Sequence, residues 1–308
     1  MTTERLLSPA ATAAALPYPA LANTIATLLR DTSVRVPTRT VLPLPQGGSL
    51  FLMPATDAQV AITKLITYVA DNAGRGLPAI QGDVVVFDAR DGQRIALLDG
   101  PTVTARRTAA VSLLAARTLA PRRDKDPGPL LIVGAGVQGR AHLEAYATDL
   151  GVRQVRVASR SAASADALVA HARSMGLDAE RVDDADAALA DCPLVVSGTP
   201  AQSVALRGMP RDDAFVAAVG AFTPRMAAWD PTVCRDIAAR GTLVVDTRDA
   251  DHEAGDLLQA GIDVTRVPTL GDMLDAPRPR GPVFFKSCGW AGWDLAAARL
   301  AVLAALTG

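Results

Sequence analysis

The chain has 308 residues, a length that suggests about two domains. Hydrophobic residues make up 49% of it and charged residues 20%, so the chain can bury a sizeable core and is not intrinsically disordered. The 31 basic residues nearly balance the 32 acidic ones. This balance argues against binding of nucleic acid by charge, which normally needs a basic surplus on one face.

Cysteine and histidine are scarce and widely separated, so the sequence shows neither a disulfide framework nor the ligand spacing of a metal site. No cysteine has the histidine signature of a nucleophile nearby, so we expect all of them to be small packing residues. We expect His142 to be structural rather than catalytic. The residues concerned are Cys192, Cys234, Cys288, His142, His171 and His252.

Two apolar stretches need comment because they could suggest a leader or a membrane anchor. The alanine-rich residues 10–22 are interrupted by Pro17 and Pro19, and no clear cleavage site follows. Residues 295–306 contain Arg299, are shorter than a membrane span and are expected to form an amphipathic helix. We therefore expect a soluble, cytoplasmic protein that does not bind membranes.

Lysine is rare in this chain. Of the 31 basic residues only Lys64, Lys125 and Lys286 are lysines, and the rest are arginines. A lysine in such a sequence indicates a place where a compact ammonium suits better than a planar guanidinium. Lys125 lies in a charged linker and is expected to be solvated, which leaves Lys64 and Lys286 as candidates for a site.

In chain order, the first 120 residues predict a small α+β domain. Apolar segments bounded by turn residues predict three strands of an antiparallel or mixed sheet, and a long helix follows them. The predicted strands cover residues 59–69, 82–87 and 93–98, and the predicted helix covers residues 104–119.

A charged segment rich in proline and glycine, residues 121–129, is typical of a linker. Beyond it, short apolar strands alternate with helical or loop segments, which predicts an α/β domain of Rossmann type, with a parallel sheet covered on both faces. A final helix covers residues 290–306, and the pattern does not settle which domain it joins. The predicted strands are 130–133, 152–158, 194–197, 215–220 and 243–246, and the clearest helices are 137–149 and 164–174.

A glycine-rich turn between the first strand and helix of this second domain predicts a dinucleotide site. Gly134 permits the tight turn, Gly136 lets the backbone approach a pyrophosphate, and Gly139 lets the helix pack on the strand. The start of the helix, with Val137 and Gln138, supplies N–H groups and the positive end of the helix dipole to the phosphates.

The end of the next strand indicates which dinucleotide is preferred. Proteins that bind NAD place an acidic residue there, but residues 151–165 contain none. Instead, Arg160 can pair with a 2′-phosphate, and the hydroxyls of Ser159 and Ser161 can donate hydrogen bonds to it. We therefore predict NADPH as the preferred cofactor, with NADH as a weaker alternative.

A second strand end contributes two more candidate cofactor contacts. Ser197 and Thr199 lie at the end of the apolar strand 194–197 and just beyond it. In an open parallel sheet, ligands bind beyond the carboxyl ends of the strands. We therefore expect both side chains to touch the cofactor.

Three cations of the first domain are candidates for binding a carboxylate. Lys64 lies in an apolar strand, where it either faces solvent or marks a site. Arg107 lies near the start of the predicted helix, among threonines that could cap it, and Arg39 follows a proline-containing turn. The sequence does not show whether the three are adjacent in space.

The residues also resemble the ornithine cyclodeaminase and mu-crystallin family over nearly the whole chain. The resemblance implies a dimer, a substrate-carboxylate site lined by Arg39, Lys64 and Arg107, and an approach of Ser287 to the nicotinamide. It also implies a substrate-binding and dimerisation domain of residues 1–120 completed by residues 285–308, around an NADP-binding domain of residues 121–284. The matching segments are VPTR (36–39), the Lys64 strand, GLP (76–78), DGPTVTARRTAA (99–110), VGAGVQGRAH (133–142), VVDTRDADHEAGDL (244–257) and FKSCGWAGWDLAAA (285–298).

One departure favours a particular branch of that family. Phe222 stands where ornithine cyclodeaminases carry an aspartate that serves the amine chemistry, and phenylalanine can neither accept a proton nor pair with an ammonium. Ketimine reductases similar to mu-crystallin also lack this acid. We therefore expect NADPH-dependent reduction of Δ1-piperideine-2-carboxylate or Δ1-pyrroline-2-carboxylate to L-pipecolate or L-proline.

In this reading Arg39 and Arg107 hold the carboxylate of the small cyclic imino acid. Lys64, as the catalytic residue, either donates a proton to the imine nitrogen or only supplies a positive field, and the sequence leaves both roles open. Two alternatives remain. One is an ornithine cyclodeaminase or alanine-type dehydrogenase, and the other is a non-catalytic protein that binds ligands in an NADPH-dependent way.

Overall fold

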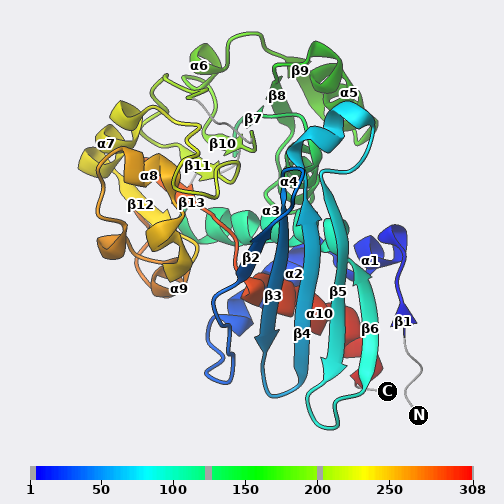
Figure 1. Ribbon diagram of the computed structural model, residues 1–308. Helices are drawn as coiled ribbons and strands as arrows, with labels where there is room; N and C mark the ends of the chain where they lie inside the picture. The colour runs from blue at the N-terminus through cyan, green and yellow to red at the C-terminus, as the bar shows by residue number, and fades with distance from the viewer. Residues whose placement is uncertain (1–4, 122–126, 200–203, 307–308) are drawn as a thin grey trace. The chain divides into compact units, whose positions relative to one another are not determined.

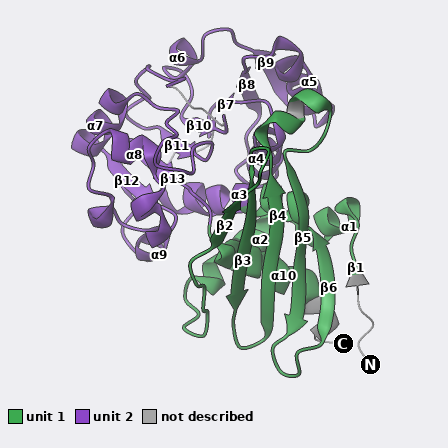
Figure 2. Ribbon diagram, in the orientation of Figure 1, with its two compact units in different colours: residues 1–107, 290–308 green, residues 108–289 purple. Residues whose placement is uncertain are grey.

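The computed structural model describes residues 5–121, 127–199 and 204–306 of the chain (Figure 1). The chain forms two compact units (Figure 2): unit 1 comprises residues 1–107 and 290–308, and unit 2 comprises residues 108–289. The predicted linker lysine, Lys125, lies outside the described residues.

Unit 1 is built on a six-stranded sheet of order β1-β6-β5-β4-β3-β2, in which all neighbours are antiparallel except β1 and β6. The three predicted strands of this domain correspond to β4, β5 and β6. Its strands are β1 (Arg5–Leu6), β2 (Thr40–Pro43), β3 (Ser49–Thr56), β4 (Val60–Tyr68), β5 (Ile80–Asp88) and β6 (Arg94–Asp99).

The helices of unit 1 include two that the sequence did not predict. The alanine-rich stretch near the N-terminus forms α1 (Pro9–Ala15) and α2 (Tyr18–Leu28), and α2 is buried through Leu21, Ile25 and other apolar residues. A short 3-10 helix, η1 (Ala70–Arg75), joins β4 to β5. Its last helix is α10 (Ala291–Leu306).

Helix α10 packs against α2 and against strands β3 and β4 (Figure 1). Residues 291–298 are all buried, so the prediction that this helix is amphipathic is wrong. The physical reason is that the sheet and α2 together enclose the helix, and its one basic residue is neutralised: Arg299 pairs with Asp31 and Asp57. The last part of the chain is therefore a central core element of unit 1.

Unit 2 is a doubly wound parallel sheet of order β12-β13-β11-β10-β7-β8-β9, which confirms the predicted α/β class. The direction in which successive strands are added to the sheet reverses between β7 and β10. Open parallel sheets bind ligands at such a reversal, beyond the carboxyl ends of the strands. Its strands are β7 (Leu130–Val133), β8 (Gln154–Ala158), β9 (Asp178–Arg181), β10 (Leu194–Ser197), β11 (Phe215–Ala218), β12 (Thr242–Val245) and β13 (Val283–Lys286).

The helices of unit 2 cover this sheet, and α4 has the predicted bounds. Helix α3 begins in unit 1, and the boundary between the units falls inside it, between Arg107 and Thr108. The helices are α3 (Gly100–Leu119), α4 (Val137–Asp149), α5 (Ala162–Ser174), α6 (Ala185–Ala188), α7 (Pro231–Arg240), η2 (Arg248–His252), α8 (Gly255–Gln259), η3 (Val264–Arg266) and α9 (Leu270–Met273).

The units divide at different residues from the predicted domains. The sequence placed residues 285–289 with the first domain, but Phe285 and Lys286 belong to β13. Phe285 pairs with Ala217 of β11 and Val244 of β12, so this segment is part of the parallel sheet of unit 2.

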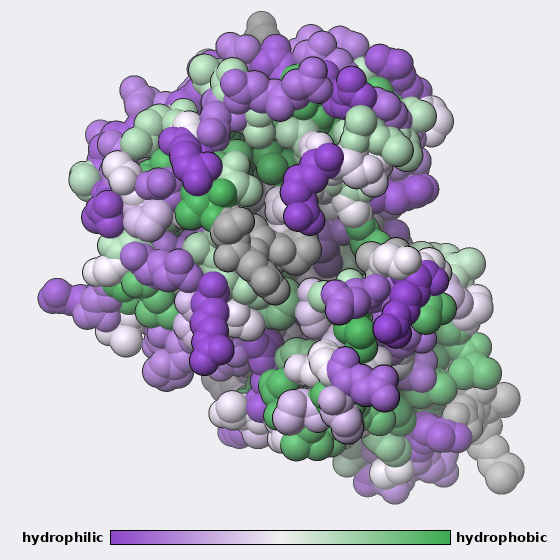
Figure 3. All heavy atoms as spheres, turned by 45° about the horizontal axis from the view of Figure 1, so that its top comes forward, coloured by the Kyte–Doolittle hydropathy of each residue, from purple (hydrophilic) through white to green (hydrophobic). Residues whose placement is uncertain are grey.

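No helix in the described part of the chain is long and apolar enough to cross a membrane. Figure 3 shows one face of the molecule, on which hydrophilic residues cover most of the surface and apolar residues form small scattered areas.

Candidate active site

The glycine-rich turn of unit 2 has the geometry that its residues predict. Gly134, directly after β7, has a φ of +108°, a conformation that side chains of L-residues rarely adopt. A Cβ on Gly139 would lie 2.2 Å from the carbonyl oxygen of Gly134, so α4 packs on β7 only because residue 139 is glycine. A Cβ on Gly136, the N-cap of α4, would meet nothing within 4 Å, which leaves the cradle open to a phosphate.

The first turn of α4 borders this cradle. Val137 is 70% exposed at the start of the helix. The side-chain oxygen of Gln138 is buried, with no hydrogen-bond partner among the described residues. The open turn and the N–H groups at the exposed start of α4, rather than this acceptor oxygen, fit the phosphates of a dinucleotide.

His142, one turn further along α4, is structural as predicted. Its Nδ1 lies 2.8 Å from the carbonyl oxygen of Gln138, and its Nε2 lies 3.0 Å from the hydroxyl of Ser112 on α3. Burial lowers the pKa of His142 to about 4, so the imidazole is neutral at physiological pH.

The end of β8 presents the residues predicted to select the cofactor. Arg160 is exposed and, within the described part of the chain, has no ion-pair partner. Ser159 is half-buried, and the Ser161 hydroxyl is the N-cap of α5, accepting a hydrogen bond from the Ser164 amide at 3.2 Å. A cation next to a helix N-terminus is a suitable place for an additional phosphate group.

The two candidates at the end of β10 differ in their surroundings. Thr199 lies beside Gly134, and its hydroxyl donates to the carbonyl oxygen of Val133 at 3.3 Å. Ser197 is buried, and its hydroxyl accepts a hydrogen bond from the indole of Trp229 at 2.9 Å. Thr199 therefore lies at the glycine-rich turn, whereas the Ser197 hydroxyl points into the core.

Ser287 is held in a buried network that the sequence did not reveal. Its hydroxyl donates to the Asp246 carboxylate at 2.8 Å, and the amides of Cys288 and Gly289 donate to the same oxygen at 3.0 and 2.9 Å. Asp246 follows β12 directly and is buried. Its carboxylate thus fixes the segment that leaves β13.

Lys286 forms a buried ion pair in the same unit. Its Nζ lies 2.7 Å from the Asp256 carboxylate, both side chains are fully buried, and the ammonium donates to the carbonyl oxygen of Ala221. Asp256 also accepts hydrogen bonds from the amides of Ala228 and Trp229, at 2.7 and 3.0 Å. Burial is the largest single influence and lowers the pKa of Lys286, but the Asp256 carboxylate, together with Cys288 and Asp246, outweighs burial and raises it. The pair holds together the loop that contains Phe222.

Lys64 lies in β4, on the face of the sheet that α10 covers. Val60, Ile62 and Ile66 share this face and are buried with it. The alternative of a solvated lysine is therefore excluded. The Lys64 Nζ lies 2.7 Å from one carboxylate oxygen of Asp294 on α10.

Arg107 completes a buried cluster of charges around this carboxylate. Its Nε lies 3.3 Å from the other oxygen of Asp294, and its side chain is 8% exposed, against 1% for Lys64 and 0% for Asp294. Arg39 is half-buried, and its guanidinium carbon lies 5.8 Å from the centroid of the Phe51 ring.

The surroundings of Lys64 bring its pKa down to about 8. Burial is the largest cause, since it disfavours the ammonium, whereas the Asp294 carboxylate raises the pKa. The positive charges of Arg107 and, more weakly, Arg39 lower it further. The structure thus brings the three predicted cations of unit 1 together, and it gives the lysine a pKa suited to proton transfer near neutral pH.

The sequence reading missed Asp294. It is the one acidic residue in α10, an otherwise apolar helix with a single arginine, and that isolation is a signal that could have found it. An acid at such a position is kept only where a cation compensates it.

The cysteines are packing residues, as predicted. All three are buried and free. Burial raises the pKa of Cys192 to about 11 and that of Cys234 to about 12, and it also raises the pKa of Cys288. None has the thiolate character of a nucleophile at neutral pH.

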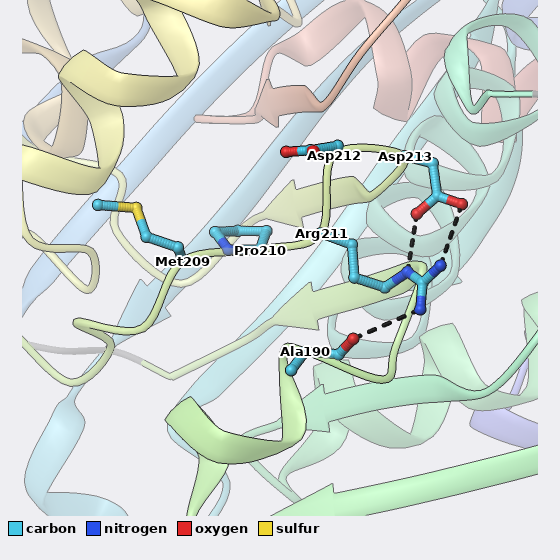
Figure 4. Close-up of a pocket in the computed structure, with 6 residues that line it drawn as sticks. All are labelled: Ala190, Met209, Pro210, Arg211, Asp212 and Asp213. Atoms are coloured by element: carbon cyan, nitrogen blue, oxygen red, sulfur yellow. Dashed lines mark hydrogen bonds and ion pairs between the residues drawn. The ribbon is translucent and has the colours of Figure 1, made fainter.

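A hollow on the surface of unit 2 contains none of the predicted site residues (Figure 4). Arg211 pairs there with Asp213 at 2.7 Å and donates to the carbonyl oxygen of Ala190, and Asp212 pairs with Arg240. Because both carboxylates have arginine partners, we place no candidate site there. Met209 and Pro210 complete the lining.

The profile of the ornithine cyclodeaminase/mu-crystallin family matches residues 11–305. The protein belongs to this family. The expectation from its motifs is therefore confirmed.

Similar proteins include two bacterial reductases. The chain is 39% identical over 300 residues to Δ1-pyrroline-2-carboxylate reductase 1 of Burkholderia multivorans, covering 94% of this chain and 92% of that one. It is 38% identical over 299 residues, with the same coverage, to the Δ1-pyrroline-2-carboxylate/Δ1-piperideine-2-carboxylate reductase of Azospirillum brasilense.

A solved structure confirms the fold. The Δ1-pyrroline-2-carboxylate reductase of Thermococcus litoralis, in complex with NADH and L-proline, superimposes with a TM-score of 0.89 over 98% of each chain. Its sequence is 24% identical, so this likeness shows the fold alone.

The packing at Gly139 leads to a first prediction. Gly139→Ala places a methyl group against the Gly134 carbonyl and forces α4 away from β7. We expect the free energy of unfolding, measured in urea, to fall by about 1–3 kcal/mol.

Gly74→Ala is the matched control, because a Cβ there meets nothing within 4 Å and its φ is not left-handed. We expect this control to change stability by less than about 0.5 kcal/mol. Equal stability of Gly139→Ala and the native protein would contradict the described packing.

Proposed function

We propose that this protein reduces small cyclic ketimine carboxylates with NADPH, converting Δ1-pyrroline-2-carboxylate to L-proline and Δ1-piperideine-2-carboxylate to L-pipecolate. The observation that carries the proposal is the buried cluster of Lys64, Arg107 and Asp294, with Arg39 beside it, in a chain whose curated relatives are named as reductases of these imino acids.

The residues of unit 2 support a nicotinamide dinucleotide as cofactor. The open cradle at Gly136 and the dipole of α4 suit its pyrophosphate. Arg160 at the end of β8, where proteins that bind NAD carry an acid, favours the 2′-phosphate of NADPH, with NADH used more weakly. Thr199 beside the turn is a further contact, and Ser159 and Ser161 lie next to Arg160.

The cations of unit 1 have separate tasks in this proposal. Arg107 and Arg39 bind the substrate carboxylate and orient the ring. The reduced nicotinamide, when bound, supplies a hydride for the C=N carbon. Lys64, beside the imine nitrogen, donates a proton to it or stabilises its positive form, and its lowered pKa suits either role.

The ring size of the preferred substrate is proposed from the relatives alone. One relative is named for the five-membered ring only, and the other for both rings. One methylene changes discrimination by about 1–3 kcal/mol, so a single pocket can accept both substrates with different efficiencies.

Phe222 argues against the cyclodeaminase alternative. It follows Ala221, whose carbonyl is held by Lys286, and it brings no carboxylate to this loop. Release of ammonia from L-ornithine with NAD would nevertheless identify a cyclodeaminase. Tight binding of NADPH without turnover of either ketimine would identify the non-catalytic binding protein.

Loss of either buried cation tests the carboxylate site. We expect Lys64→Ala and Arg107→Ala each to lower kcat/KM for Δ1-pyrroline-2-carboxylate by at least about thirtyfold, since truncating a buried charged partner costs about 2–5 kcal/mol. The steady-state rate of NADPH oxidation at varied substrate concentration measures kcat/KM.

Arg106→Ala is the matched control on the same helix. This arginine donates to the carbonyl oxygen of Leu16 at 2.7 Å and stacks on the Tyr18 ring, away from the cluster. We expect its kcat/KM to stay within about threefold of the native value. Native efficiency in Arg107→Ala would exclude the proposed carboxylate site.

Removal of Arg160 tests the cofactor preference. We expect Arg160→Ala to raise KM for NADPH at least about tenfold, through loss of a charge-assisted contact to the 2′-phosphate, and to leave KM for NADH nearly unchanged. Arg153→Ala, at an exposed arginine near the other end of β8, is the control. Equal loss with both cofactors would refute a role in 2′-phosphate binding.

The sheet of unit 1 supports the proposed homodimer. Its face opposite α10 carries Leu42 and Leu65, which are 49% and 44% exposed, and their strand neighbours Leu50 and Leu52. An apolar sheet face of this kind suits burial against a second copy of the chain.

A charge on that face tests the dimer. We expect the native protein to have twice the chain mass of 31.9 kDa by light scattering, and Leu65→Lys to shift the equilibrium to monomer. Met175→Lys, at an exposed apolar residue of unit 2, is expected to stay dimeric. A native monomer would contradict the proposal.

A further inference from the structure

Asp294 is the acidic member of the buried cluster in unit 1. Its two carboxylate oxygens contact different cations, Lys64 at 2.7 Å and Arg107 at 3.3 Å. The three come from separate elements, β4, α3 and α10, so the carboxylate joins a strand and two helices.

The charges that face Lys64 come from several elements. Arg107 approaches from α3, Arg39 from the segment before β2, and Asp294 from α10. The strands on either side of β4 place Met53 and Val84 opposite Lys64, and neither carries a charge. Asp294, at 2.7 Å, is the anion with the largest influence on this ammonium.

Without this carboxylate, two buried cations would repel each other with nothing to compensate them, an arrangement that proteins avoid. With it, the cluster of Lys64, Arg107 and Asp294 keeps one surplus positive charge. This surplus charge, to which Arg39 beside the cluster adds, attracts the negative charge of a monocarboxylate.

We propose that Asp294 is a positioning residue that holds the Lys64 ammonium charged and directed, and leaves the cluster one net positive charge for the substrate carboxylate. This inference rests on the proposed function and adds to it a residue that does not itself bind substrate or cofactor.

The direction of the expected effect follows from the sign of the charge. Asp294 raises the pKa of Lys64, while burial and the two arginines lower it to about 8. Asp294→Asn removes the main influence that raises it, so the lysine should lose its proton at lower pH. Activity that needs the ammonium is lost as pH rises through this pKa. The alkaline limb of the pH–activity profile of Asp294→Asn should therefore move toward neutral pH.

Direct titration of the lysines tests the inference without any substrate. The chain has only Lys64, Lys125 and Lys286, so protein labelled with 13C at the lysine Cε gives three side-chain signals by NMR. The signal missing from Lys64→Met identifies Lys64. We expect the Lys64 titration in Asp294→Asn to move to lower pH by at least about one unit, or tenfold in proton affinity, while Lys286, paired with Asp256, does not move.

Two further variants separate charge from packing. Asp57→Asn is the matched control, because Asp57 has a fully buried side chain and pairs at 2.7 Å with Arg299, on the same helix as Asp294. It should leave the Lys64 titration and the alkaline limb of kcat/KM unchanged. Asp294→Glu keeps the anion but displaces it by one methylene, so we expect near-native titration of Lys64 with a kcat at least about tenfold lower.

The outcomes distinguish the inference from the proposed function. An unchanged Lys64 titration in folded Asp294→Asn overturns the inference even if ketimines are reduced. A shifted titration in a protein that reduces no ketimine supports the hold of Asp294 on Lys64 and refutes the proposed function. If Asp294→Asn does not fold, native kcat together with native titration in Asp294→Glu overturns the positioning role.

Discussion

Two cations and one carboxylate lie buried together in unit 1, and the compensation of their charges constrains how this unit folds. Lys64 reaches the cluster from the middle of a strand, and Asp294 from a helix near the end of the chain. Neither charge would be tolerated in this core without the other, because an isolated buried charge is strongly destabilising. Helix α10 must therefore return to the sheet for the lysine to be buried, which couples completion of the unit to assembly of its cationic site.

Unit 2 contains a second buried pair of the same kind. Lys286 and Asp256 are fully buried, and they hold the loop of Ala221 and Phe222 and the segment around Trp229. In a chain that uses arginine almost everywhere, the two lysines that the structure describes both occupy such positions. A compact ammonium fits a closed cavity beside a single carboxylate. A guanidinium is larger and carries more N–H groups, each of which needs a hydrogen-bond acceptor when buried. Rarity of lysine was therefore a useful signal for structurally demanding sites.

Much of this was predictable from local sequence. The bounds of β7 and α4 follow from an apolar run, a glycine-rich turn and a helical pattern, and Lys64 shares the parity of Val60, Ile62 and Ile66 in its strand. The burial of α10 and the pairing of Asp294 were not predictable, because they depend on contacts between distant parts of the chain. Helices α1 and α2 were missed because Pro17 and Pro19 interrupt the alanine-rich stretch, yet both prolines lie at the start of α2, where the first turn of a helix tolerates them.

The central claim is that the cluster in unit 1 binds the carboxylate of a cyclic imino acid. The most direct test is a crystal structure of the protein with NADP+ and L-proline. The account predicts the proline carboxylate within hydrogen-bond distance of the Arg107 guanidinium, with the ring nitrogen toward the ammonium of Lys64. A carboxylate bound to other residues, with the cluster of Lys64, Arg107 and Asp294 closed and without contact to the ligand, would contradict it.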